Sequence, residues 1–160
     1  HPAVDEESVE MVGSSYGGYL ASILSAIRPV RWMALRAPAL YKDDEWLTSK
    51  QHLDRQEIAR YRALELPANS NRALAASAAF KGDVLLVESE LDHIVPHTVI
   101  ENYLAAFLKT RSMTHRMIPE ADHSLSKKEW SNAYTEMLVK WMSEMLGHAR
   151  EGLASGPTLR

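Results

Sequence analysis

One serine in this sequence lies in a pattern that suits nucleophilic chemistry. Ser15 is the third residue of Gly-Ser-Ser-Tyr-Gly-Gly, residues 13–18, which fits Gly-x-Ser-x-Gly. A short apolar run, residues 9–12, precedes this segment, and a helical pattern over residues 16–27 follows it. A strand, a sharp turn and a helix are the context in which such a motif exposes a serine hydroxyl. Only Ser15 has a glycine two residues before it, so Ser15 is the predicted nucleophile.

The predicted turn sets requirements for its neighbours. Ser15 must adopt a strained backbone conformation to project its hydroxyl. Gly13 and Gly17 are expected to crowd the neighbouring strand and helix, so that only glycine fits at either position. The backbone N–H of Tyr16 lies at the predicted helix N-terminus, where it can stabilise developing negative charge on an oxyanion.

An activated serine needs a general base, and the base needs an acid that orients it. In parallel α/β sheets these groups lie in loops that follow the carboxyl ends of strands. Two such loops contain suitable residues, 88–96 and 120–126. Asp92 from the first and His123 from the second give the chain order Ser, Asp, His, which accompanies a strand–turn–helix nucleophile.

Each assignment has rivals. Glu88 or Glu90 could orient the histidine in place of Asp92. His123 is one of seven histidines, but it alone follows a predicted strand and precedes a capped helix. Asp122 is its sequence neighbour, and adjacent side chains seldom achieve the approach to the ring nitrogen that an orienting acid needs.

A metal site is the other interpretation of the first loop. His93 and His97 are four residues apart and lie near Asp92, but Pro96 interrupts the helix that would bring both histidines to one face. We therefore predict no metal and no cofactor.

The apolar pattern predicts four strands that alternate with helices, and hence an α/β domain with a parallel sheet flanked by helices. The predicted strands are residues 9–12, 30–37, 84–87 and 114–118. The predicted helices are residues 16–27, 51–66, 72–80 and 98–109. A fifth, long helix is predicted to begin at a capping box, residues 126–129, and to end at Gly147. Residues 69–70 are the expected cap of the short helix at 72–80.

Composition narrows the class of protein. The chain has 160 residues, enough for one domain with a real core. Its net charge of −3 and its lack of a basic run argue against nucleic acid as a partner. No apolar run approaches the roughly 18 residues of a membrane span. The absence of cysteine excludes disulfides and thiolate sites, and it is compatible with the cytoplasmic location that we predict.

Three separated motifs in the right order make the sequence resemble the C-terminal half of an α/β-hydrolase. They are the Ser15 turn, the Asp-x-x-Val-Pro loop that begins at Asp92, and the Asp-His-Ser loop around His123. The Ser-Tyr-Gly-Gly and Asp-x-x-Val-Pro segments are most similar to the prolyl oligopeptidase-like and dienelactone hydrolase-like branches. The resemblance implies a triad of Ser15, Asp92 and His123. One departure is Ser89, because these enzymes usually have glycine three residues before the acid.

The resemblance also implies a domain organisation. Residues 1–150 would form a partial α/β-hydrolase-like domain, with a helical cap insertion at about 41–80, and residues 151–160 a disordered tail. The first four strands of the family's sheet, and the loop that supplies a second oxyanion N–H, have no counterpart in the sequence. We therefore expect the chain to be the C-terminal part of a larger hydrolase, or to pair with another chain along the edge of the strand before Ser15.

The predicted function is hydrolysis of a small-molecule ester, thioester or amide through an acyl-enzyme, as in a carboxylesterase. A serine peptidase of the prolyl oligopeptidase-like family is one alternative. A non-catalytic α/β-hydrolase-like module, which binds a ligand or partner through residues 41–80, is the other.

Overall fold

The computed structural model describes residues 9–154 of the chain, with side chains over residues 9–148. Four parallel strands form one sheet in the order β1–β2–β3–β4. They are β1 (Glu10–Ser14), β2 (Trp32–Arg36), β3 (Asp83–Ser89) and β4 (Ser112–Ile118). The predicted α/β fold with a parallel sheet is therefore confirmed.

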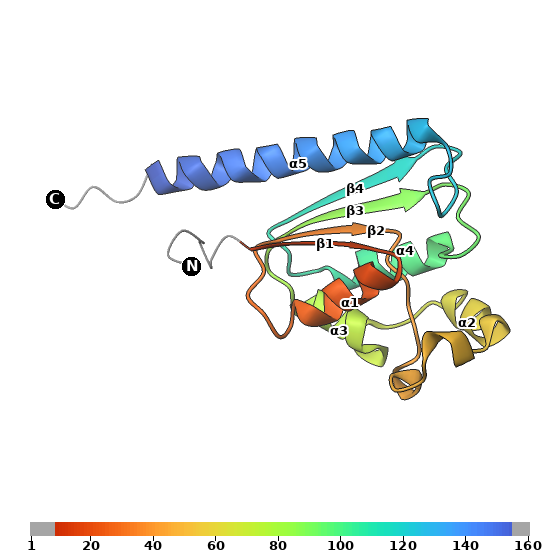
Figure 1. Cartoon of the computed structure of the whole chain (residues 1–160). Helices are drawn as coiled ribbons and strands as arrows, with labels where there is room; N and C mark the ends of the chain where they lie inside the picture. Colours follow the sequence, from red (N-terminus) through yellow and green to blue (C-terminus); the bar gives the residue numbers. More distant parts are fainter. Residues whose placement is uncertain (1–8, 155–160) are drawn as a thin grey trace.

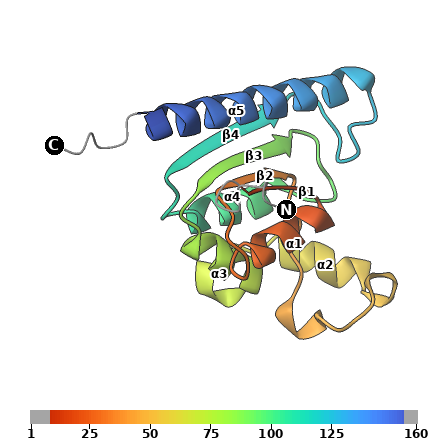
Figure 2. The same cartoon turned by 60° about the vertical axis from the view of Figure 1, so that its left-hand side comes forward.

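Helices cover both faces of the sheet (Figure 1). Three helices pack on one face, α1 (Tyr16–Leu24), α3 (Arg72–Ala79) and α4 (His97–Ala106), and α5 (Lys128–Ala154) covers the other. Figure 2 shows the same two layers from another direction, with α2 (Arg55–Arg62) beyond the ends of the strands. Short 3₁₀ turns connect these elements, at Asp43–Glu45, Lys50–His52 and Ala68–Ser70. No helix in the described part of the chain is long and apolar enough to cross a membrane.

The two central strands carry the core. Every residue of β2 and β3 is buried, because helices lie above and below them. Alternate side chains point to opposite faces, so that Met33 and Leu35 join the cluster under α1 and α4, while Trp32 and Ala34 pack against α5. β1 and β4 are the edge strands of the described sheet.

Helices α1 and α4 each end three residues earlier than predicted, at Leu24 and Ala106. Three further differences from the predicted helix boundaries and caps have an identifiable local cause. The predicted helix 51–66 is only α2, because Asp54 caps it by accepting hydrogen bonds from Gln56 N and Glu57 N. The cap of α3 is Asn71 rather than residues 69–70, and its side chain accepts from the N–H groups of residues 73 and 74.

The last helix shows the third difference. α5 continues through Gly147 to Ala154, since a glycine in a helix costs only about 1 kcal/mol and does not end it by itself. The predicted tail at 151–160 is thus helical up to residue 154, and its remainder lies outside the described residues.

A buried carboxylate fixes the beginning of β3 and predicts an acid-sensitive stability. The Asp83 side chain accepts hydrogen bonds from Arg111 Nε at 2.9 Å and from Ser112 Oγ at 2.7 Å. Burial alone would raise the pKa of Asp83, but these hydrogen bonds and the Arg111 charge outweigh it and hold the pKa below its ordinary 3.8.

A carboxylate with a depressed pKa stabilises the fold above its unfolded-state pKa, and this contribution is lost as pH falls through the folded-state pKa. We expect Asp83→Asn to lower the free energy of unfolding, and the difference from the wild type should be largest above a pH of about 4. Below that pH the difference should become progressively smaller. Urea unfolding of both proteins between neutral and acidic pH measures this difference, and a difference that is constant with pH would contradict the assignment.

Candidate active site

Ser15 lies on a sharp turn between β1 and α1. Its backbone has φ 53° and ψ −116°, a positive φ that only strain explains for a residue with a side chain. Neighbouring backbone holds this conformation: Ser15 N donates to Arg36 O at 2.9 Å, and Ser15 O accepts from Ala39 N at 3.0 Å. The turn lifts the Ser15 hydroxyl to the carboxyl end of the sheet, as the sequence motif predicts.

The glycines around this turn differ in why they are needed. A Cβ at Gly13 would lie 2.5 Å from Gly17 O and 2.8 Å from Gly18 Cα, so Gly13 is required by close approach of two backbones. A Cβ at Gly18 would lie 2.9 Å from Pro38 Cβ. A Cβ at Gly17 would meet nothing within 4 Å, so the expectation that Gly17 must be glycine for lack of space is wrong. The crowded position on the helix side is Gly18.

Asp92 follows β3 in a tight turn that fixes its carboxylate. Oδ1 accepts hydrogen bonds from the N–H groups of Ile94 and Val95, both at 2.8 Å. Oδ2 faces His123 Nδ1 at 2.7 Å. The Asp92 side chain is only 3% exposed. With one oxygen held by two backbone donors, the other is directed at the imidazole.

His123 connects the acid to the serine. It lies in the loop between β4 and α5, and its Nε2 is 2.9 Å from Ser15 Oγ. Because Nδ1 donates to the Asp92 carboxylate, Nε2 is left as the acceptor for the serine O–H. The structure therefore brings Ser15, His123 and Asp92 into one row of hydrogen bonds, although the three residues come from three separate loops.

The rival acids and histidines have other partners. The Glu88 carboxylate contacts His97 Nδ1 at 2.7 Å and His115 Nε2 at 2.8 Å, away from His123. Glu90 accepts from the backbone N–H of Glu120 at 2.8 Å and so joins the loops that contain Asp92 and His123.

The remaining rivals are Asp122 and the histidines of the acid loop. The Asp122 carboxylate hydrogen-bonds to the Ser126 hydroxyl and N–H, which lowers the pKa of Asp122. The partner of Asp122 is thus Ser126, just before α5 begins at Lys128, and not His123. His93 lines the cleft, whereas His97 pairs with Glu88. Among residues 9–148, no three His, Asp or Glu side chains form a group that could hold a metal ion.

Arg36 is a residue of this site that sequence reasoning missed. It ends β2, is 9% exposed, and donates from Nε to Ser14 Oγ at 2.8 Å and from Nη1 to His123 O at 2.9 Å. Burial lowers the pKa of Arg36, and Tyr134 and the carboxylates of Asp92 and Asp122 oppose that shift. Arg36 therefore ties the histidine loop to the serine turn. The one signal that could have indicated it is the position of this arginine within the apolar strand predicted at residues 30–37.

We expect Arg36→Met to lower kcat by about 10- to 100-fold, because small displacements of a catalytic group carry penalties of this size. KM should change less than kcat, since Arg36 positions His123 and lies outside the residues that line the cleft. Steady-state kinetics on a para-nitrophenyl ester, with a thermal melt to verify folding, measure this. Ser14→Ala removes one of the two contacts and should have the smaller effect. If Arg36→Met and Ser14→Ala lost the same amount of kcat and the same amount of thermal stability, Arg36 would contribute only to packing.

A cleft of about 870 Å³ opens beside the serine and histidine. Ser15 and His123 line it, together with residues from the segment before α2, from α2 itself and from the loop after Asp92. Within residues 9–148, no hydrogen bond uses the backbone N–H of Tyr16, the first residue of α1. That N–H is thus available where the sequence predicts an oxyanion donor.

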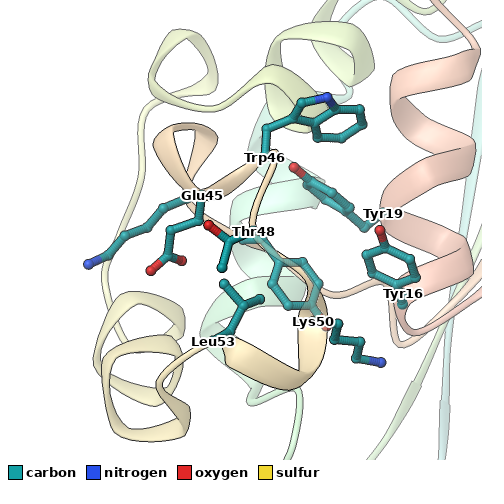
Figure 3. A pocket seen from close by; sticks show the side chains of 9 residues that line it. Tyr16, Tyr19, Glu45, Trp46, Thr48, Lys50 and Leu53 are labelled. Carbon is teal, nitrogen blue, oxygen red and sulfur yellow. The ribbon is translucent and has the colours of Figure 1, made fainter.

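A small aromatic pocket adjoins the cleft (Figure 3). Tyr16 and Tyr19 come from α1, and Trp46 faces them from the segment after β2, where it follows the 3₁₀ turn Asp43–Glu45. Its volume of about 30 Å³ matches about one water molecule, so it is too small for a substrate. Burial raises the pKa of Tyr19 to about 12, with Asp43 adding to the shift, so its phenol stays neutral. The rings pack on one another: Tyr19 contacts both Tyr16 and Trp46.

A serine on a strained turn at the carboxyl end of a parallel sheet, in line with a histidine and an acid, places the chain among the serine hydrolases of the α/β-hydrolase class. Within that class the chain belongs to the prolyl oligopeptidase family, whose sequence profile matches residues 1–149. The resemblance stated from the motifs is thereby confirmed. A search of curated protein sequences finds no match.

Solved structures with the same fold include lipases, esterases and peptidases. Paleococcus ferrophilus monoacylglycerol lipase is 20% identical with a TM-score of 0.60, over 84% of this chain and 68% of the lipase. An esterase domain from a Rhodothermus marinus protein is 20% identical with a TM-score of 0.57, over 82% and 59%. Porphyromonas gingivalis dipeptidyl peptidase 4 is 18% identical with a TM-score of 0.61, over 89% and 20%. The chain thus spans about two thirds or less of these proteins, and the likeness concerns the fold.

Proposed function

We propose that this chain carries the catalytic groups of a serine hydrolase that cleaves an ester, thioester or amide through an acyl-enzyme. The observation that supports this most is the row of hydrogen bonds from Asp92 through His123 to Ser15. A serine without a base within reach would have no way to lose its proton during attack.

In the proposed mechanism, His123 Nε2 takes the proton from Ser15 Oγ as the oxygen attacks the substrate carbonyl. Asp92 holds the imidazole in the tautomer that accepts this proton and stabilises the imidazolium that forms. The Tyr16 N–H donates to the oxyanion. His123 then protonates the leaving group, and after its departure it activates a water that releases the acyl group from Ser15. No cofactor takes part in this proposal.

We favour a carboxylesterase-like activity over a peptidase. The residues that line the described cleft include no Asp or Glu, so this cleft offers no carboxylate to hold the amino terminus of a peptide. In this proposal, the α2 region serves as part of a cap over the site, since α2 and the preceding turn supply much of the cleft wall. A cytoplasmic location and the lack of a nucleic-acid partner stay predictions from composition.

We also propose that the free edge of β1 pairs with a further strand. Within the described sheet β1 has a neighbour on one side only, and Val12 on it is 50% exposed. Natural proteins cover such edges. Hydrogen exchange tests this: slow exchange of the outward β1 amides in the isolated chain, at a concentration where it is monomeric, would contradict the proposal.

Covalent labelling tests the proposed nucleophile. A fluorophosphonate probe should add its mass to Ser15 in the wild type, which peptide mapping locates. Ser15→Ala should remove the label and His123→Ala should slow labelling strongly, whereas Ser131→Ala, which alters an exposed serine on α5, should label as the wild type does. A folded wild-type chain that leaves Ser15 unlabelled would favour the non-catalytic binding module.

A further inference from the structure

The charges in the cleft beside Ser15 are all of one sign. Its charged lining residues are Lys50, Arg55 and Arg62, and the described lining has no acidic residue. The chain as a whole has 21 acidic and 18 basic residues, so its average composition does not explain a purely cationic cleft. A cleft with charges of one sign concentrates ligands of the opposite sign.

Arg62 is the most unusual of these cations because it is buried. It is the last residue of α2 and is 5% exposed. Nε donates to Leu40 O at 3.1 Å, Nη1 donates to Ile94 O at 2.7 Å, and the guanidinium lies 4.9 Å from the centre of the Tyr41 ring. No carboxylate among the described residues forms an ion pair with it, and Nη2 takes part in none of their hydrogen bonds.

A buried cation without an anion is costly, because burial removes water and nothing of opposite charge replaces it. The nearby acids do not fill this role. Glu57 on the same helix pairs with Lys42 and Arg60, and Asp43 pairs with Arg72. The planar guanidinium is thus held in place by two carbonyls and an aromatic ring, with donors left for an anion.

We propose that the cleft selects substrates that carry an anionic group, and that Arg62 binds this group, with Lys50 and Arg55 adding to the field at the cleft. This rests on the proposed hydrolase function, because it names the substrate class of the same site. Apolar side chains line the cleft too, at Leu53, Ile58, Ala59 and Ile94. The substrate class is therefore a carboxylic ester with an aliphatic chain that ends in a second, free carboxylate.

Matched esters test this selectivity. The para-nitrophenyl monoester of adipate and para-nitrophenyl hexanoate have acyl chains of equal length and differ in the terminal carboxylate. A charge-assisted, bidentate contact predicts a kcat/KM for the anionic ester about 10- to 100-fold above that for the neutral one. This ratio should fall towards one in Arg62→Gln, fall in part in Arg55→Gln, and shrink as NaCl is added.

Arg60→Gln is the matched control. Arg60 lies on the same helix but outside the cleft lining and pairs with Glu57, so its substitution should leave the ratio unchanged. A purely structural role of Arg62, as a clamp on Leu40 and Ile94, would slow both esters alike and leave the ratio as in the wild type. That result, or a wild type with no preference for the anionic ester, would overturn the proposal.

A binding measurement separates this proposal from the proposed function. In Ser15→Ala, monomethyl adipate should bind at least about 10-fold more tightly than methyl hexanoate, and the added Arg62→Gln change should remove the difference. Anion-selective binding in a chain that neither labels at Ser15 nor turns over ester would leave the cleft proposal standing and defeat the hydrolase function. Ester turnover without selectivity for the anionic ligand in either assay would support the hydrolase function and defeat the cleft proposal. If Arg62→Gln does not fold, the exposed Arg55 and Lys50 variants decide, because both should lower the ratio.

Discussion

Asp92→Asn is expected to lower kcat on para-nitrophenyl acetate by about 10⁴-fold while the fold is kept. The reason lies in how the two carboxylate oxygens are used. Oδ1 accepts from the N–H groups of Ile94 and Val95, and the amide oxygen of asparagine can take over both bonds. Its NH₂ must then occupy the place of Oδ2, which faces His123 Nδ1.

Two N–H donors cannot hydrogen-bond to each other, so the imidazole changes tautomer in this variant. Nδ1 becomes the acceptor and Nε2 carries the hydrogen. Nε2 then donates towards Ser15 Oγ, 2.9 Å away, and can no longer take the serine proton. The expected loss thus arises from the position of one proton, with the backbone contacts of the loop unchanged.

Burst and steady-state kinetics on the same ester measure this effect, with a thermal melt to establish that the variant is folded. Asp122→Asn is the matched control, because Asp122 adjoins His123 in sequence but bonds to Ser126. It should keep most of its activity. A loss of less than about 10-fold in Asp92→Asn, or equal losses in both variants, would show that Asp92 does not orient the base.

The groups of the candidate site that could be predicted from the sequence are those whose positions follow from local patterns. Ser15, Asp92 and His123 each lie just after a predicted strand. In a parallel sheet the carboxyl ends of neighbouring strands meet at one edge. Three residues far apart in the chain could therefore be expected together without knowledge of a single side-chain contact.

The contributions of Arg36 and Arg62 could not be predicted in this way. Each acts on backbone carbonyls of distant segments, His123 for the first, and Leu40 and Ile94 for the second. Such contacts depend on how loops fold over the sheet, and no spacing in the sequence encodes them. In the sequence, Arg62 resembles an ordinary surface charge, and Arg36 differs from one only by its place in an apolar strand.

The end of β3 shows the same limit for the fold. The apolar run predicts a strand over residues 84–87, yet β3 extends to Ser89 with Glu88 buried within it. His97 and His115 make this burial possible by contacting the Glu88 carboxylate, and the hydrogen bond that His97 donates to Glu88 raises the pKa of His97. A charge inside a strand is thus explained only by partners on α4 and β4.

Gly13→Ala is expected to destabilise the fold by about 3 kcal/mol or more, at the upper end of the cost of overpacking. The new Cβ would lie 2.5 Å from Gly17 O and 2.8 Å from Gly17 C and Gly18 Cα. All three are backbone atoms in the first turn of α1, so no side chain can turn aside to make room. The helix would have to move away from β1, and with it the turn that holds Ser15.

Gly17→Ala makes the matched comparison within the same motif. Its Cβ would meet nothing within 4 Å, and Gly17 has no positive φ that alanine would resist. Because alanine favours a helix over glycine by up to about 1 kcal/mol, this variant should be as stable as the wild type or slightly more stable. Urea unfolding of the two variants therefore assigns the role of each glycine. Equal destabilisation would mean that both positions are crowded. The expected contrast would mean that, of these two positions, only Gly13 requires a glycine, because there the strand and the helix approach each other closely.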